Sequence, residues 1–449
     1  MMDKLYTLNP KVLWAQFKKE HFAFWMICAY LILQYLDPLR IYEELAVLPL
    51  DKVVLILALL TLPMDPRRRR VRDSANILMT VFLVVIVVSS AMAVYPSISW
   101  GRWFDFFEWY VIYFLIINIV TTSERYFIFL AIFLMSNFKM SFFGARTWAE
   151  RGFGFASWGL MGPPGYFQNS SDFSGEMLMF APIAFELALY VKPYVRRLTY
   201  WFLMLGAVTG AMSILGASSR GSQLALAFQG GWLAIQRKLK LKILLAIAIV
   251  AALGYALLPA AEKARFSSVG TDSTSIQRLD YWRGGLEMIK EHPFLGVGYF
   301  NFAPVYASRA YDKLWHGKAQ LPHNIFIQVG TDSGLIGLAV FLALIGCNLK
   351  RTADIRRACK ENAGAPGYAP AVARGLVLTT WGFVIAGQFN TVSYYPFLWI
   401  NLALTVSLSS IVKNSEKIVV APASHQLAAP AVPAHTRVVD SSVAAHNVR

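Results

Sequence analysis

Charged residues are scarce in this sequence. They make up 15% of its 449 residues, whereas hydrophobic residues make up 56%, so the chain is far more apolar than a soluble domain of this length. Alternating strands of roughly ten residues, which a membrane-spanning β-barrel requires, are also missing. Apolar runs of about twenty residues recur instead, and in lipid these specify helices. The sequence therefore predicts an all-α polytopic membrane protein.

Cysteine is rare as well. The three cysteines, Cys28, Cys347 and Cys359, form no Cys-X-X-Cys pair, so we expect neither a disulfide framework nor a cysteine metal site. No Asp-X-Asp motif is present, and no His, Asp and Glu residues cluster at ligand spacing. We therefore expect no bound metal and no cofactor.

Acidic residues are outnumbered by Lys and Arg, 26 to 42, which gives a net charge of +16. In a soluble protein this surplus would raise the question of nucleic acid. Here most of it lies in short basic loops, which is the positive-inside signature of a membrane protein. No basic stripe with interleaved aromatic residues appears. We therefore expect membrane lipids as partners and no nucleic acid.

The basic clusters also predict the topology. If each cluster is cytoplasmic, an even number of spans must separate successive clusters, and this holds along the chain. The strongest cluster is 65–70, and both chain ends are expected in the cytoplasm of a bacterial inner membrane. About twelve transmembrane helices are expected, at 21–36, 45–64, 75–95, 104–121, 126–142, 174–191, 198–216, 223–236, 243–258, 335–349, 375–392 and 397–412.

Four regions follow from this topology. Residues 1–258 carry the first nine helices, and residues 259–334 form a large periplasmic loop that contains amphipathic helices. Residues 335–412 carry the last three helices. Residues 413–449 lack hydrophobic periodicity, so we expect a disordered cytoplasmic tail.

The periplasmic loop carries many cations on the side where cations should be rare. Acidic neighbours on a solvated face would balance most of them, including Lys263, Lys290, Arg309 and Lys313, and a smaller subset could bind an anion. Residues 278–289 predict an amphipathic helix, because apolar residues recur at helical spacing: Leu279, Trp282, Leu286 and Ile289.

Three basic side chains are candidates for chemistry, and each has a plainer alternative. Arg278 opens the amphipathic helix, whose arginines could simply face water. His323 closes the loop at the bilayer edge, where a lone histidine is often structural. Arg220 lies among small residues at a helix junction, where it could snorkel to the interface.

The order of the motifs resembles the O-antigen ligase and polymerase family, membrane glycosyltransferases that use polyprenyl-diphosphate-linked glycans. The resemblance is densest from about residue 217 to 337. It rests on Ser-Ser-Arg-Gly at 218–221, Arg278 before Tyr281 and Trp282, His-Pro-Phe-Leu-Gly-Val-Gly at 292–298, His323-Asn324, and Gly-Leu-Ile-Gly at 334–337. Residues 165–172 also resemble the family's glycine- and asparagine-rich segment, although some of its usual residues are replaced.

The resemblance implies a glycosyl transfer on the periplasmic face. The donor would be an undecaprenyl-diphosphate-linked glycan, and the acceptor would be a hydroxyl of a glycan or of lipid A core. Arg220 and Arg278 would bind the leaving diphosphate bidentately, and His323 would deprotonate the acceptor. A single metal-independent displacement would invert the anomeric carbon. Further substrate-binding candidates are Tyr281, Trp282, Arg283, Asn324, Arg146 and Arg151.

Other functions remain open at this point. A polymerase of O-antigen or exopolysaccharide, or a protein O-glycan transferase, would use the same donor and differ in its acceptor. A polysaccharide-lipid transporter or flippase would also use about twelve helices, but it predicts mid-span ionisable residues and related halves. Glu186 approaches the first feature, and no internal symmetry is visible. A non-enzymatic membrane scaffold is a further alternative.

Overall fold

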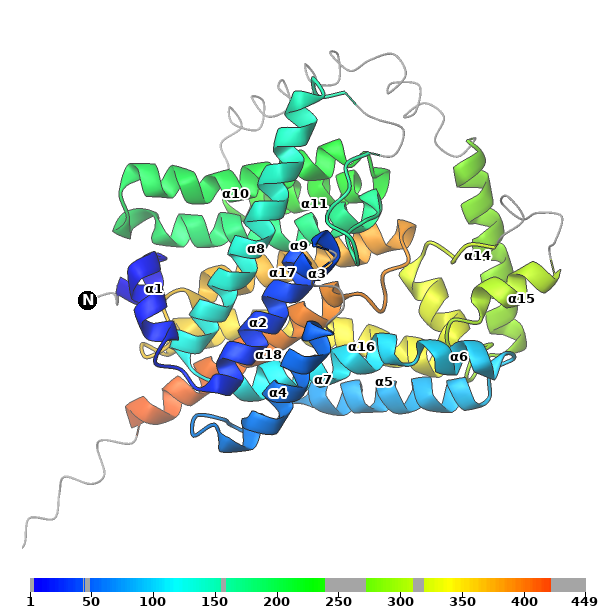
Figure 1. Ribbon diagram of the computed structural model, residues 1–449, viewed down its shortest axis with the longest axis horizontal. Helices are drawn as coiled ribbons and strands as arrows, with labels where there is room; N and C mark the ends of the chain where they lie inside the picture. The colour runs from blue at the N-terminus through cyan, green and yellow to red at the C-terminus, as the bar shows by residue number, and fades with distance from the viewer. Residues whose placement is uncertain are drawn as a thin grey trace, which may run out of the picture.

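The computed structural model describes residues 4–42, 44, 49–154, 159–238, 272–309 and 319–420, and all regular elements within these ranges are helical. Figure 1 shows the helices packed side by side along the long axis of the molecule, with α2 and α8 inclined across it. The α-helices are α1 (Pro10–Phe17), α2 (Phe22–Leu36), α3 (Pro38–Ile41), α4 (Leu50–Thr61), α5 (Ser74–Ala91), α6 (Pro96–Arg102), α7 (Phe104–Ile119), α8 (Ser123–Glu150), α9 (Ser170–Val191), α10 (Arg197–Gly216), α11 (Arg220–Gln236), α14 (Ser273–Glu291), α15 (Phe302–Arg309), α16 (Ile325–Glu361), α17 (Ala369–Ala386) and α18 (Pro396–Val420). Short 3-10 helices are η1 (Lys4–Thr7), η3 (Leu62–Met64), η4 (Lys192–Tyr194) and η6 (Gly387–Phe389).

The structure confirms an all-α polytopic membrane protein. In the described part of the chain, seven helices are long and apolar enough to cross a membrane, namely α5, α8, α9 with η4, α10, α16, α17 with η6, and most of α18. Shorter helices α2, α4, α7 and α11 occupy four other expected spans. The expected span at 243–258 lies outside the described residues. The total of twelve spans therefore stays a prediction.

Several predicted helix boundaries are wrong. Helix α8 continues to Glu150, so residues 144–150 are helical rather than part of an external loop. Helix α18 continues to Val420, so the predicted tail begins within a helix, and its remainder, 421–449, lies outside the described residues. Helix α17 ends at Ala386, before the predicted end at residue 392.

Helix α16 shows why the predicted span at 335–349 began late. The helix starts at Ile325 and is interrupted at Gly334, where φ is +66°. A Cβ at this position would collide with the carbonyl oxygen of Phe294, so the close approach of the loop requires glycine. Residues 325 and 327–334 are buried although several are polar. Because hydropathy alone reports only the apolar part, the sequence predicted a span beginning after Gly334.

Buried ion pairs gather the segments that were predicted to be cytoplasmic. Arg125, at the start of α8, is fully buried and donates from Nε to Glu20 at 2.7 Å and from Nη1 to Asp65 at 2.6 Å. Arg351 of α16 pairs with Asp73 at 3.0 Å. A buried charge without its partner would cost several kcal/mol, about 3–5, so these pairs fix the ends of the helices together.

Glu186 belongs to a second such cluster. Its Oε2 accepts hydrogen bonds from Arg237 at the end of α11, at 2.5 Å, and from Arg374 in α17, at 2.7 Å. The basic pattern predicted both arginines near the cytoplasmic side. Glu186, the ionisable residue that came nearest to the mid-span charges expected of a transporter, is therefore held in an ion-paired cluster.

The opposite end of the bundle carries α6, α14 and α15, whereas the N-terminus and α1 lie at the other end (Figure 1). Hydrogen bonds tie this region to the spans. The Ser89 hydroxyl of α5 donates to the carbonyl oxygen of Leu295, just after α14, at 2.9 Å, and the Val94 N–H, just after α5, donates to the carbonyl oxygen of Val297 at 2.9 Å. Residues 278 and 323 lie in this region.

Candidate functional site

Arg220 is the first residue of α11, directly after a tight turn. Ser218 has φ +58°, and Ser219 is the N-cap residue. The Arg220 Nη1 lies 3.0 Å from Asp272 Oδ2, and about a third of its side chain is exposed. Gly221 lets the helix approach the ring of Phe389, because a Cβ there would lie 2.7 Å from that ring.

Asp272 links Arg220 to the helix that carries Arg278. Its carboxylate caps α14 by accepting from the Ser275 N–H at 3.0 Å and from the Ser275 hydroxyl at 2.8 Å. Desolvation raises the pKa of Asp272, but the hydrogen bonds from Arg220 and Ser275 outweigh it and lower the pKa to about 2. The carboxylate is therefore ionised and fixes the position of Arg220 relative to α14.

Arg278 lies in the second turn of α14 and is mostly buried. Its Nε is buried without a hydrogen-bond partner, and its guanidinium has no ion pair with any residue in the described ranges. Desolvation lowers the pKa of Arg278, the charge of Arg220 lowers it further, and Asp272 opposes both. A guanidinium stays protonated in proteins. The structure thus holds a buried cation with free hydrogen-bond donors, as an anion-binding site requires.

His323 lies in the turn before α16, in a left-handed conformation with φ +51°. Its backbone N–H donates to Thr391 Oγ1 at 2.9 Å, and its ring Nε2 lies 3.1 Å from Gln320 Oε1. Burial lowers the pKa of His323, and the charge of Arg278 lowers it further, to about 4. The imidazole is therefore neutral at neutral pH and can accept a proton.

The sequence did not identify the segment that holds these three residues together. Residues 387–391 were assigned to a transmembrane helix, but they form η6 and a loop. The Phe389 ring packs on Gly221 and lies 6.4 Å, centroid to centroid, from Trp282. Thr391 binds the His323 backbone. The polar run Gly-Gln-Phe-Asn-Thr at the end of an apolar span was the available signal.

Trp282 and Tyr281 connect α14 to the turn of His323. The Trp282 indole N–H donates to the carbonyl oxygen of Pro322 at 2.9 Å. The Tyr281 hydroxyl accepts from the Gln320 N–H at 3.1 Å, and its ring is fully buried. Both residues are placed to position the turn.

Asn324 and Arg283 have other surroundings. Asn324 is buried and caps α16, with Oδ1 accepting from the Phe326 and Ile327 N–H groups, while its Nδ2 donates to Gln388 at 3.3 Å. Arg283 is largely exposed and lies 3.5 Å from Asp280 one turn earlier. Among the described residues, neither side chain forms a hydrogen bond or an ion pair with Arg278.

Arg146 and Arg151 lie at the end of α8. Arg146 is exposed and pairs with Glu150 at 2.6 Å. Arg151 is the exposed C-cap residue of α8. Among the described residues, neither has a hydrogen bond or ion pair to Arg220, Arg278 or His323, so the structure does not join them to the central three.

Comparison with known proteins shows what this chain is similar to. A family model described as O-antigen ligase matches residues 182–342, a range that contains all three central residues. This part of the chain is therefore similar to the O-antigen ligase family. The O-antigen ligase of Salmonella typhimurium (strain LT2) is 29% identical over 192 residues, which cover 40% of this chain and 46% of that protein. The chain thus spans about half the length of this curated relative.

The matched domain leaves some features outside. Residues 387–391, which fix His323 and Asn324, lie beyond its end, and Arg146 and Arg151 lie before its start. Within the described ranges, no group of three or more His, Cys, Asp or Glu residues is arranged to hold a metal ion. The matched domain and the similarity to a curated O-antigen ligase together support an O-antigen ligase family membrane protein.

Proposed function

We propose that the protein is a membrane glycosyltransferase of the O-antigen ligase type. It transfers a glycan from an undecaprenyl-diphosphate donor to an acceptor hydroxyl, with lipid A core as the acceptor. The buried Arg278 guanidinium, which lacks an anionic partner in the described structure, is the observation that carries this proposal. The match of residues 182–342 to the O-antigen ligase family supports it.

The two arginines bind the donor diphosphate. In the reaction the bond between the anomeric carbon and the phosphate oxygen breaks, and its electron pair stays on the leaving diphosphate. Guanidiniums placed in advance stabilise that charge without reorganisation. Arg220 can exchange its contact with Asp272 for a phosphate oxygen, because a third of its side chain is exposed. Arg278 has no hydrogen-bond or ion-pair partner among the described residues, so its donors are available to the phosphate.

His323 activates the acceptor. Its neutral imidazole removes the hydroxyl proton while the acceptor oxygen forms the new bond to the anomeric carbon. If Nε2–H donates to Gln320 Oε1, Nδ1 is the nitrogen that takes the proton. Attack on the face opposite the leaving group inverts the anomeric configuration. Bound diphosphate offsets the charge of Arg278, which raises the pKa of His323 and strengthens the base.

The proposed site faces the periplasm of the bacterial inner membrane, and both chain ends are cytoplasmic. The supporting observation is that ion pairs gather the predicted cytoplasmic segments at one end, around Arg125 and Arg351. Residues 259–334 then act as a periplasmic region with the catalytic side chains, although residues 259–271 and 310–318 lie outside the described structure.

Labelled lipid-linked glycan in proteoliposomes separates the candidate functions. The proposal predicts covalent transfer to lipid A core that is lost in Arg278→Ala. Transfer to a second lipid-linked repeat unit would identify a polymerase. Movement of the label across the bilayer without a new bond would identify a flippase, and the absence of both would leave a scaffold.

A further inference from the structure

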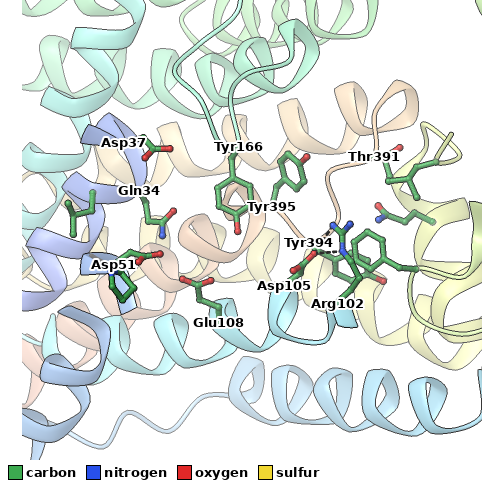
Figure 2. A pocket seen from close by; sticks show the side chains of 16 residues that line it. Gln34, Asp37, Asp51, Arg102, Asp105, Glu108, Tyr166, Thr391, Tyr394 and Tyr395 are labelled. Carbon is green, nitrogen blue, oxygen red and sulfur yellow. Dashed lines mark hydrogen bonds and ion pairs between the residues drawn. The ribbon is translucent and has the colours of Figure 1, made fainter. Parts of the chain in front are cut away.

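A polar cavity of about 570 Å³ lies beside the His323 turn. This volume falls in the range of small-ligand pockets. Figure 2 shows Asp37, Gln34 and Asp51 at one end of the cavity and Thr391 at the other, with Tyr166 and Tyr395 between them. Neither the family match nor the proposed roles of the two arginines assigns this cavity a ligand.

Carboxylates dominate the charge of the cavity. Four acidic residues line it, namely Asp37, Asp51, Asp105 and Glu108. Arg102 is the one cation among the lining residues. Arg102 is paired with Asp105 at 2.8 Å and lies 4.2 Å from the centre of the Phe300 ring. The lining residues thus include more carboxylates than cations, and this surplus disfavours anions.

The remaining walls combine aromatic rings with hydrogen-bonding groups. Tyr166 and Tyr395 meet edge to face, with ring centroids 5.1 Å apart. Gln328 lines the cavity and is 2% exposed; its Oε1 accepts from the Ser393 N–H at 3.3 Å. Its side-chain amide nitrogen, Nε2, has no hydrogen-bond partner among the described residues. A buried amide with a free donor needs a partner inside the cavity.

The cavity adjoins the proposed base. Thr391 lines it, and the Thr391 hydroxyl accepts the hydrogen bond from the His323 backbone. Leu321, two residues before His323, also lines it. Arg278 lies one turn of α14 before Trp282, whose indole N–H donates to the carbonyl oxygen of Pro322, next to His323. The His323 turn therefore borders both the arginine site and the acidic cavity.

We propose that this cavity binds the acceptor saccharide and selects sugars that are uncharged or carry amines. Carboxylates and the Gln328 amide match hydroxyl groups in both hydrogen-bonding directions, and the tyrosine rings match the apolar faces of sugar rings. Phosphorylated or uronate-rich sugars are repelled by the carboxylates. The inference rests on the proposed glycan transfer. It predicts that the sugar that accepts the glycan lies in a part of the acceptor molecule without phosphate.

Oligosaccharide binding to the full chain in lipid nanodiscs tests the inference. Three tetrasaccharide probes of similar size differ in charge: N-acetylglucosamine (neutral), glucosamine (cationic) and galacturonate (anionic). We expect the neutral or the cationic probe to bind in saturation-transfer NMR and the anionic probe not to bind. Asp51→Asn with Glu108→Gln should weaken binding about tenfold. Binding of the anionic probe alone, or of no probe, would overturn the inference.

Controls separate the cavity from the donor site. Glu361→Gln, an exposed change at the far end of α16, should leave probe binding unchanged. Farnesyl diphosphate, which has no sugar, should bind equally well to the cavity double variant and to wild type. Lipid-linked glycan donor should bind together with the probe. If donor displaces the probe, the cavity holds the donor glycan, and the acceptor assignment is wrong.

The two proposals fail in different ways. Probe binding is measured without any transfer, so a protein that binds the probes but transfers no glycan would contradict only the proposed function. Transfer that continues in a protein with no carboxylate-dependent probe binding would contradict only the cavity assignment. Thermal unfolding of the double variant at the wild-type temperature confirms that it is folded.

Discussion

The indole N–H of Trp282 donates a hydrogen bond to the carbonyl oxygen of Pro322 at 2.9 Å. Trp282 follows Arg278 by one helical turn, and His323 follows Pro322 directly. Together with the bond between the Gln320 N–H and the Tyr281 hydroxyl, this bond joins the helix that carries the proposed diphosphate ligand to the turn that carries the proposed base. The distance between guanidinium and imidazole depends on it.

Trp282→Phe should slow transfer while the fold persists. The ring remains, but the donor is lost, at a cost of about 1 kcal/mol or roughly fivefold in rate. Turnover and donor affinity measured on the purified protein give the effect. The matched change Trp14→Phe, on the exposed face of α1, should have none. Equal turnover in both variants would show that the bond does not position the site.

The arginine variants test diphosphate binding. Arg220→Ala and Arg278→Ala should each lower the transfer rate about a hundredfold, because a charge-assisted contact in the transition state contributes roughly 2–4 kcal/mol. Arg278→Lys should restore little, since an ammonium cannot bind bidentately. Lys290→Ala, an exposed change on the same helix, should transfer normally. Near-normal turnover in Arg278→Lys would contradict bidentate binding.

The proposed topology can be tested by cysteine labelling. In a background without Cys28, Cys347 and Cys359, a cysteine at the exposed Glu287 position of α14 should react with an impermeant reagent in intact spheroplasts. A cysteine at the exposed Arg68 position should react only after the membrane is broken. The reverse pattern would place the site in the cytoplasm, where the proposed periplasmic reaction could not occur.

Much of the helical architecture followed from the sequence. Apolar length and the spacing of basic clusters predicted the spans because both report on the bilayer directly. They failed where polar residues are buried inside the protein. Residues 325–334 were assigned to the loop, although they form the first part of α16 and nearly all of them are buried. A hydropathy reading cannot distinguish a buried polar helix from an exposed one.

The roles of the site residues stay predictions. Motif order singled out Arg220, Arg278 and His323, and the structure brings their elements together at one end of the bundle. The contacts that do so are long-range: Phe389 lies 168 residues after Gly221, on which it packs. Tyr281 and Asn324 stay candidate ligands, and the Tyr281 hydroxyl and Asn324 Oδ1 accept hydrogen bonds from backbone N–H groups. Neighbours in sequence do not reveal direction in space.

The pH dependence of transfer should follow the His323 pKa. Burial and Arg278 lower this pKa from 6.5 to about 4 in the free protein, and the reaction needs the neutral ring. The ratio kcat/KM, which reports the free enzyme, should therefore stay flat as pH falls and decline only near pH 4. The decline in kcat should occur at higher pH, because bound diphosphate offsets the charge of Arg278. An acid limb of kcat/KM above pH 6.5 would contradict this assignment.

His323→Ala gives the most direct test of the whole arrangement, with donor affinity and single-turnover rate measured on the same preparation. Donor binding depends on the arginines, so its Kd should match that of wild type. The chemical step should slow about 10²- to 10⁴-fold, because the acceptor loses its base. Turnover equal to wild type, with donor binding and thermal stability also unchanged, would show that His323 is not the base and contradict the account.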